Sequence, residues 1–420
     1  MTELRLAWRN VGRNPRRTLL TVAATVFAVF LVVVFVAMAR GMHEKMIEDN
    51  VRLVSGHAMV AASGYLEDRT LDHYIELSPE LIERLDSEPE VEGWAPRVMS
   101  FGLLSQDATS RGVGLLGVDP QRERSVTSLA QRIVSGRFLD AEASANGERE
   151  IVLGRRLADR LGAELGDEVL VYGVAYSLET SYDLFNVVGL IGVPDAELER
   201  TMAVVALSDL QAFLAYGNRV NEVAVLAESA ERTEELSTAL VAQFANVDSG
   251  DPLGDGIVVH PWPEVLPDLE QFLILDDLGL YMMLIILVLV VGFGILNTVL
   301  MAVLERQREL GVMLALGLRP MAVFRVVFLE SLMLAAVGLA VGLALAVPVA
   351  LWMQANPIPL GGEMAGSAEF AGMDPVIVSR LAASTLWKSA LMIFGVAALA
   401  ALYPALKASR SRPVDALRSV

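Results

Sequence analysis

Long apolar runs alternate with polar stretches along this chain, and their placement predicts a membrane protein. Four runs are long enough to supply the roughly 20 helical residues that cross a hydrocarbon core. We expect spans at residues 18–42, 272–304, 323–352 and 386–406. A polar stretch of over two hundred residues separates the first span from the other three.

The polar stretch, residues 43–271, has short apolar runs separated by turn signals, which predicts strands interleaved with short helices. Residues 98–105 and 112–118 are expected to form a hairpin, and Ser78 with Pro79 to begin a helix. Ser208 and Gln211 have the spacing of a capping box. The predicted fold class is therefore an α-helical membrane protein with four transmembrane helices and a large extracytoplasmic α+β domain between helices 1 and 2.

The segments outside the spans complete the predicted organisation. In residues 1–17, Arg5, Arg9 and Arg13 recur at the spacing of an amphipathic surface helix, which also serves as an anchor and orientation signal. Residues 305–322 contain a short charged helix between two spans, which we call the coupling segment. The others are a Pro- and Gly-rich outer loop at 353–385 and a tail at 407–420.

Charge sets the predicted orientation, because Lys and Arg near span ends favour the cytoplasm. Residues 1–17, 305–325 and 407–420 together carry +9, so the rest of a chain with net charge −18 carries −27. Both termini and the coupling segment are therefore expected to be cytoplasmic. An acidic outer domain argues against a nucleic-acid partner.

The basic start and first apolar run also fit a secretory signal, with Ala37-Met38-Ala39 resembling a cleavage site. The run is longer than the 7–15 residues of a signal core, so a membrane span is favoured.

Signals for catalysis are weak. Gly112 to Gly117 has dinucleotide-binding spacing, but no helix is predicted after it, so glycines of a tight strand are the better interpretation. The acidic pairs Glu234-Glu235 and Asp276-Asp277 are expected to be solvated helix faces or ends. The histidines lack ligand spacing: His43, His57, His73 and His260. We predict no catalytic, cofactor-binding or metal-binding residue on this chain.

The third span contains two features of its own. Gly338 and Gly342 form a small-x-x-x-small pattern that lets helix backbones approach closely, and helix packing is the expected role. Glu330 lies about two turns inside the same span, where a charge is costly unless it faces water, protein or the interface. A proton relay would need partners that the sequence does not identify.

Several motifs together resemble permease subunits of the FtsX/MacB/LolC/LolE superfamily of ABC transporters, over nearly the whole chain. Those shared with the superfamily are Ala7–Asn10, Asn14–Arg17, Glu305–Gly317, Tyr403–Ala405 and Arg412–Arg418. The pattern is most similar to LolC and LolE at Gly41–Glu44, Leu116–Pro120, Ile151–Gly154 with Leu157-Ala158, and Leu184–Gly189.

This resemblance implies a MacB-like periplasmic core with Porter-like and Sabre-like subdomains, with about residues 120–200 as the Sabre-like insert. It implies a second permease subunit, identical or different, and a cytoplasmic ABC ATPase dimer that holds ATP and Mg. A location in the bacterial inner membrane and lipoprotein or lipid-linked cargo passed to a periplasmic carrier or adaptor would follow. The chain departs from LolC between Val171 and Leu184, where the hook that catches the carrier is short.

Two sets of functional residues are predicted. The chain has no Gly-x-x-x-x-Gly-Lys-Ser/Thr loop, so ATP hydrolysis is expected on another subunit. The coupling segment should contact that ATPase, because it is a charged cytoplasmic helix whose Leu310, Met313 and Leu314 share one side. The predicted contact residues are Glu305, Arg306, Arg308, Glu309, Leu310, Gly311, Met313, Leu314 and Gly317. Adaptable apolar side chains near the outer ends of the first two spans are candidates for cargo contact: Phe35, Met38, Met42, Met282, Met283 and Ile286. The alternatives are a MacB-like exporter of peptides or small molecules and an FtsX-like regulator of a cell-wall hydrolase.

Overall fold

A computed structural model describes residues 15–229, 232–244, 256–362, 365–366 and 375–410. The chain divides into two compact units. We call Met1–His43, Leu273–Pro359 and Ile377–Val420 the membrane unit, and Glu44–Phe272 with Leu360–Val376 the outer unit. Most of the predicted amphipathic helix at 1–17, and all but the first four residues of the predicted tail, lie outside the described residues.

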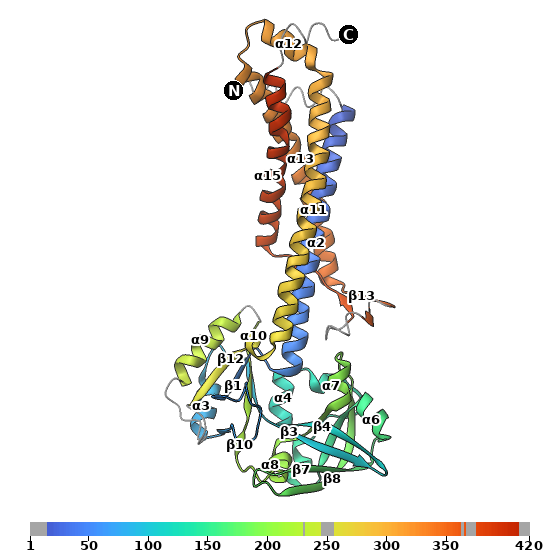
Figure 1. The fold of residues 1–420 in the computed structure, drawn as a ribbon, viewed down its shortest axis with the longest axis vertical. Coiled ribbons are helices and arrows are strands. Elements are labelled where there is room, and N and C mark those ends of the chain that lie inside the picture. The colour runs from blue at the N-terminus through green and yellow to red at the C-terminus, as the bar shows by residue number, and fades with distance from the viewer. Residues whose placement is uncertain (1–14, 230–231, 245–255, 363–364, 367–374, 411–420) are drawn as a thin grey trace. The chain divides into compact units, whose positions relative to one another are not determined.

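Four long helices confirm the predicted spans (Figure 1). Each is long and apolar enough to cross a membrane. Their bounds are α2 (Pro15–Val54), α11 (Pro267–Glu305), α13 (Pro320–Ala355) and α15 (Ala383–Ser409).

Helix α2 continues well past the predicted end of the first span at residue 42. The added residues are good helix formers with charges at helical spacing. Lys45 pairs with Asp49, and Arg52 Nε lies 3.4 Å from Glu48 Oε1, so i,i+4 ion pairs support the extra turns. Apolar content alone marks the span but not the helix end.

Close packing of α2 against α13 depends on the two glycines of the small-x-x-x-small pattern. A Cβ atom on Gly338 would lie 2.6 Å from the Thr25 Cβ, and one on Gly342 would lie 2.6 Å from the Val29 Cβ. No side chain tolerates that distance, so only glycine permits this approach of the two backbones. The predicted packing role of these glycines is confirmed.

Helix α11 is covered much less than the other spans. In its most apolar window 6% of residues are buried, against 28–33% in the other three helices. Most of its apolar surface therefore faces outward in the described membrane unit.

The outer unit is built on a ten-stranded mixed sheet with the order β12-β1-β11-β3-β4-β9-β6-β8-β5, and β7 pairs with β3 and β8. The predicted hairpin is confirmed, since β3 pairs antiparallel with β4 from Arg97–Val118 to Gln106–Thr109. The strands are β1 (Ala58–Ala62), β3 (Gly93–Gln106), β4 (Thr109–Val118), β5 (Ile133–Gly136), β6 (Glu150–Gly154), β7 (Glu168–Val174), β8 (Thr180–Ile191), β9 (Met202–Ala206), β11 (Glu222–Leu226) and β12 (Ile257–Pro261).

Short helices connect the strands and give the predicted α+β class (Figure 1). Two short strands, β2 (Ile75–Glu76) and β10 (Arg219–Val220), form a separate pair. The helices are α3 (Pro79–Ser87), α4 (Pro120–Val126), η1 (Leu129–Arg132), α5 (Ala141–Ala145), α6 (Arg155–Leu161), α7 (Ala196–Thr201), α8 (Leu207–Phe213), α9 (Thr233–Phe244) and α10 (Trp262–Val265).

Two serines predicted at helix starts behave differently. The helix predicted to begin at Ser78 and Pro79 is confirmed as α3, and the Ser78 Oγ accepts a hydrogen bond from the Leu81 N–H at 3.2 Å. The capping box predicted at Ser208 and Gln211 is wrong, because α8 begins at Leu207, which places Ser208 inside the helix, and the helix has no side-chain cap. Ser208 instead lies 2.7 Å from the Ser144 hydroxyl, and Gln211 donates to the Arg219 carbonyl.

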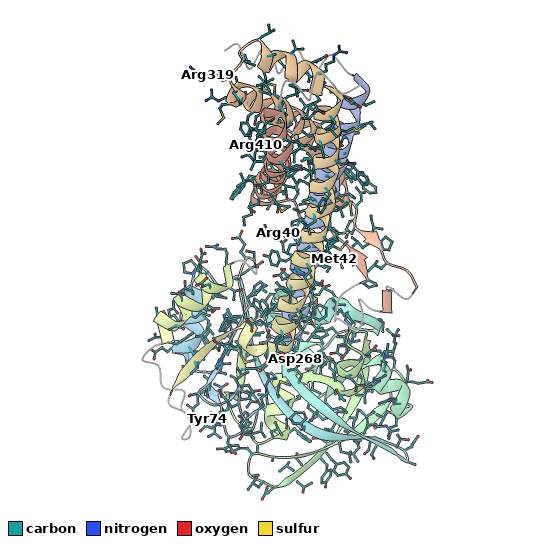
Figure 2. All side chains as sticks on the ribbon, turned by 45° about the horizontal axis from the view of Figure 1, so that its top comes forward. Arg40, Met42, Tyr74, Asp268, Arg319 and Arg410 are labelled. Atoms are coloured by element: carbon teal, nitrogen blue, oxygen red, sulfur yellow. The ribbon has the colours of Figure 1, made fainter. Side chains whose placement is uncertain are left out.

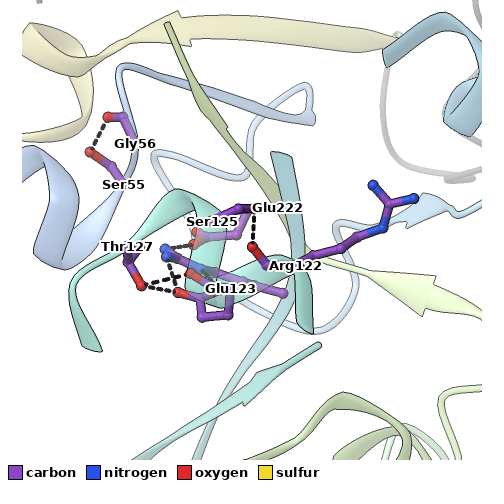
Figure 3. A network of polar contacts seen from close by, with 8 residues as sticks. Ser55, Gly56, Arg122, Glu123, Ser125, Thr127 and Glu222 are labelled. Carbon is purple, nitrogen blue, oxygen red and sulfur yellow. Dashed lines mark hydrogen bonds and ion pairs between the residues drawn. The ribbon is translucent and has the colours of Figure 1, made fainter. Parts of the chain in front are cut away.

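A buried ion cluster lies between β3, α4 and β11. The Arg97 guanidinium is 1% exposed and donates to both carboxylate oxygens of Glu123, at 2.6 and 3.2 Å. Glu123 also accepts from the Thr127 hydroxyl at 2.7 Å, and Glu222 Oε1 lies 3.5 Å from Arg97 Nη1. Figure 3 shows Glu123, Thr127 and Glu222 within this network. A carboxylate on each side lets the arginine remain charged in the core.

Candidate functional site

The coupling segment is a short helix set between two breaks in the backbone. Arg306, with φ −104° and ψ 15°, separates α11 from α12 (Gln307–Ala315). Gly317 then adopts φ +93°, a left-handed conformation that favours glycine, and Pro320 occupies the first turn of α13. These breaks let α12 take a direction of its own.

Arg306 ties this segment to the third span. Its Nη1 lies 3.0 and 3.2 Å from the two carboxylate oxygens of Glu330, and its Nε lies 3.3 Å from Glu309 Oε2. The Glu330 side chain is only 9% exposed, so this is a largely buried ion pair. The sequence predicts that Glu330 needs a polar environment but does not identify Arg306, which is 24 positions away.

One side of α12 packs inward on the membrane unit. Leu310 is 3% exposed and belongs to a cluster in which Val303, Val323 and Val327 are buried. Met313 and Leu314 are half-buried against the same cluster, and Gly311 is buried. This side anchors α12 on the membrane unit and leaves Met313 and Leu314 partly exposed.

The opposite side of the coupling segment is exposed. Arg319 and Arg410 lie toward one end of the membrane unit, and Arg40 and Met42 toward the other (Figure 2). The predicted ATPase-contact residues that are exposed on α12 and its flanks are Glu305, Arg308, Glu309 and Gly317. Val312, Leu316 and Leu318 are exposed apolar neighbours that the prediction omitted. The contact itself stays a prediction.

The predicted cargo-contact residues differ in exposure. Met282, Met283 and Ile286 on α11 are each more than half exposed. Phe35, Met38 and Met42 on α2 are partly covered. Their role in cargo binding also stays a prediction.

His43 makes a contact that sequence spacing does not reveal. Its Nε2 bonds to Asp276, and its Nδ1 lies 3.4 Å from Asp277 Oδ1. The aspartate pair, expected to be solvated, thus joins α11 to α2 within the membrane unit. The described residues contain no group of three or more His, Cys, Asp or Glu residues placed to hold a metal ion.

Family models match both parts of the chain. Residues 18–243 match the MacB-like periplasmic core domain, and residues 281–413 match the FtsX-like permease C-terminal segment. The chain belongs to the ABC-transporter permeases of the LolC/LolE/MacB type. This confirms the predicted family and its fold class.

Three relatives place this permease within its family. It is 23% identical over 414 residues to the lipoprotein-releasing system transmembrane protein LolC of Neisseria meningitidis serogroup B, covering 96% of this chain and 94% of the relative. It is 22% identical to the corresponding LolE of Haemophilus influenzae, covering 90% and 88%. The macrolide export ATP-binding/permease protein MacB of Nitrobacter winogradskyi is 24% identical, covering 98% of this chain but 59% of the relative.

Proposed function

We propose that this permease is the membrane subunit of an ATP-driven transporter that extracts lipoproteins or other lipid-linked cargo from the bacterial inner membrane. Matches over most of both chains to relatives named as parts of lipoprotein-releasing systems support this proposal. In this arrangement the termini and the coupling segment are cytoplasmic, and the acidic outer unit is periplasmic.

The proposal assigns ATP hydrolysis to a separate ATPase dimer. The relative whose name includes ATP-binding extends well beyond the matched region. The present sequence contains no Gly-x-x-x-x-Gly-Lys-Ser/Thr loop to cradle phosphates. ATP and Mg would therefore be held by the ATPase, and a second permease subunit would complete the membrane part.

The two-sided coupling segment is the observation that carries the proposal. Its outward side offers charged Arg308 and Glu309 beside exposed Leu316, which suits a protein partner. Its inward side is fixed by Leu310 and by the pairing of Arg306 with Glu330. A push on α12 would therefore move α13 as a rigid body instead of being absorbed by a loose loop.

The ATPase contact is tested with the double variant Arg308→Glu, Leu316→Asp in the full complex, because Arg308 is exposed and lies outside the Arg306–Glu309–Glu330 network. Leu316 is 82% exposed, so the change should leave the membrane unit folded while removing apolar contact and reversing a charge. We expect loss of ATPase copurification with normal membrane insertion. Leu178→Asp is the matched control, because Leu178 is 87% exposed but lies in the outer unit. Normal ATPase recovery with the double variant would reject this contact.

Cargo entry is proposed between α2 and α11 near their outer ends, where exposed Met282 supplies an adaptable apolar surface. Photo-crosslinking probes at Met38 and Met282 should capture acylated protein before ATP is added and lose it afterwards. A probe at Leu399, which is 73% exposed on α15, should give only phospholipid products. Phospholipid products alone at all three positions would count against cargo entry here.

A MacB-like exporter is the second candidate, because the core-domain match and the MacB relative both favour it. Capture of a peptide or small molecule instead of acylated protein would select it, and a copurified cell-wall hydrolase would select the FtsX-like regulator. The connection between β7 and β8 spans only residues 175–179. The proposal therefore assigns no carrier-docking hook to this subunit.

A further inference from the structure

Helix α11 presents an uncovered stripe of side chains in the membrane unit. Its members recur every three or four residues, which places them on one side of the helix. All of them are exposed: Ile286, Val290, Phe293, Asn297, Met301 and Leu304. Side chains at this spacing face either lipid or a neighbouring helix that packs along the stripe. The polar content of the stripe decides between these two.

Asn297 is the member of the stripe that does not suit lipid. Between Leu278 and Leu304, the other side chains with hydrogen-bonding groups are Tyr281 and Thr298. The Thr298 hydroxyl donates to the Gly294 carbonyl at 2.8 Å, whereas the Asn297 amide makes no hydrogen bond to the described residues. It lies eight residues before the end of α11, about 12 Å along the helix axis. An amide exposed to lipid at this depth favours a polar partner on another helix.

The amide of Asn297 is complementary to a second copy of itself. Its carbonyl oxygen accepts and its NH₂ group donates, so opposite partial charges face each other when two such amides meet. Two copies of one chain have the same orientation in a membrane, so the two-fold axis that relates them is perpendicular to the bilayer. Each residue then lies at the same depth as its counterpart. An amide on the seam between the copies therefore meets its own equivalent.

The neighbours of Asn297 on the stripe provide the apolar part of such a contact. Val290 is 65% exposed, Met301 is 56% exposed and Leu304 is 42% exposed. The stretch from Val290 to Leu304 is about 21 Å long at 1.5 Å per residue. Apolar side chains along this length supply van der Waals packing, and a single polar residue among them fixes the register of the two helices.

We propose that two copies of this chain pair along α11 from Val290 to Leu304, with their Asn297 amides hydrogen-bonded to each other. This pairing rests on the second permease subunit of the proposed function and makes that subunit a copy of this chain. The outer part of α11, which contains Met282 and Met283, lies beyond the contact and stays available to cargo.

Disulfide crosslinking tests the contact, because the chain has no cysteine of its own that would interfere. The full chain, with one introduced cysteine, is expressed from its own chromosomal locus and oxidised in its own membrane. Asn297→Cys and Val290→Cys should each give a product of twice the chain mass, since a disulfide needs Cα atoms within about 7 Å. Leu289→Cys is the matched control: Leu289 is 54% exposed but points about 100° away from Val290, so little product is expected.

Two further variants separate the amide pair from apolar contact. Asn297→Leu and Asn297→Gln each carry Val290→Cys as the reporter, and the crosslinked fraction is measured while the protein is diluted in lipid vesicles. Loss of the amide pair in Asn297→Leu should weaken dimerisation about tenfold. Asn297→Gln keeps a donor and an acceptor and should retain most of the affinity. The melting temperature of the monomer should be the same in both variants, because the Asn297 amide has no partner among the described residues.

Equal crosslinking at Leu289→Cys and Val290→Cys, or no product of twice the chain mass at Asn297→Cys, would overturn this pairing. A crosslinked product of any other mass would also overturn it, in favour of a different partner subunit. An unchanged dissociation constant for Asn297→Leu would reject the amide pair. The proposed function fails separately: crosslinked pairs that capture no acylated protein at Met282 would reject lipoprotein extraction and leave this contact standing.

Discussion

The two units of this permease differ in how they accommodate buried charged side chains. The outer unit encloses an ion cluster, in which Arg97 has carboxylates on two elements. The membrane unit instead packs glycine against Thr25 and Val29, and its Arg306–Glu330 pair joins the coupling segment to α13. In the outer unit, opposite charges on neighbouring elements let an arginine stay buried in the core. In the membrane unit, helices approach closely at glycines, and an ion pair fixes a short helix to its neighbour.

The largest expected effect comes from breaking the outer cluster. Arg97→Met leaves Glu123 and Glu222 buried without their cation, which should lower the free energy of unfolding of the outer unit by about 3–5 kcal/mol. Chemical denaturation followed by hydrogen exchange of outer-unit peptides measures it. Arg232→Met is the control, because Arg232 pairs with Glu90, Glu228 and Glu235 at the surface, and no measurable change is expected. An equal loss of unfolding free energy in the two variants would show that the buried cluster contributes no more than the surface ion pairs.

The next effect tests packing in the membrane unit. Gly342→Leu forces a side chain into Val29 and should destabilise the helix bundle by about 1–3 kcal/mol. Gly294→Leu is the matched control, since a Cβ there meets nothing within 4 Å. Both variants are compared by denaturant titration in detergent. Similar stability of the two would show that the α2–α13 contact is not tight.

A smaller loss of stability is expected when the pH is lowered. Burial, reinforced by the charge of Arg52, lowers the pKa of His57 to about 4 from 6.5. The folded outer unit therefore keeps His57 neutral, and this stability is complete above pH 6.5 and is lost as the pH falls toward 4. Between pH 7 and pH 5 the loss should be about 2 kcal/mol. His57→Asn, which keeps an acceptor for the Ala227 N–H, should reduce this pH dependence.

The smallest change in the stability of the outer unit is expected when it is separated from the membrane unit. The outer unit has its own sheet and core, so residues 44–272 expressed alone should melt cooperatively. Circular dichroism and hydrogen exchange measure this. A persistently unfolded product would show that the outer unit depends on the membrane unit.

Sequence patterns predicted the parts of this fold that local physics controls. Four apolar runs predicted four helices, and Ser78 with Pro79 predicted a helix start, where the serine oxygen accepts from a backbone N–H three residues away. Ser208 is not a cap because α8 begins at Leu207, and the Ser208 hydroxyl inside the helix lies 2.7 Å from that of the distant Ser144. Tertiary competition of this kind is not visible in a local window.

For the candidate sites too, local features were predictable from the sequence and tertiary contacts were not. The coupling segment was predicted from its charge and position, but which side faces inward depends on packing against Val323 and Val327. The pairing of Arg306 with Glu330 requires the turn at Gly317, which brings two helices together. Gly112 and Gly114 were correctly placed in a strand, yet the cavity that they line depends on α7 and β9, which come much later in the chain.

The contact of His43 with Asp276 and Asp277 has a mechanical consequence. It acts as a pin between α2 and α11, near the end of the membrane unit where Arg40 and Met42 lie (Figure 2). Because successive helical residues point about 100° apart, turning α11 about its axis would carry the two aspartates away from the imidazole. Sliding or tilting both helices together would not. The pin therefore favours displacement of α2 and α11 together over rotation of α11 about its own axis.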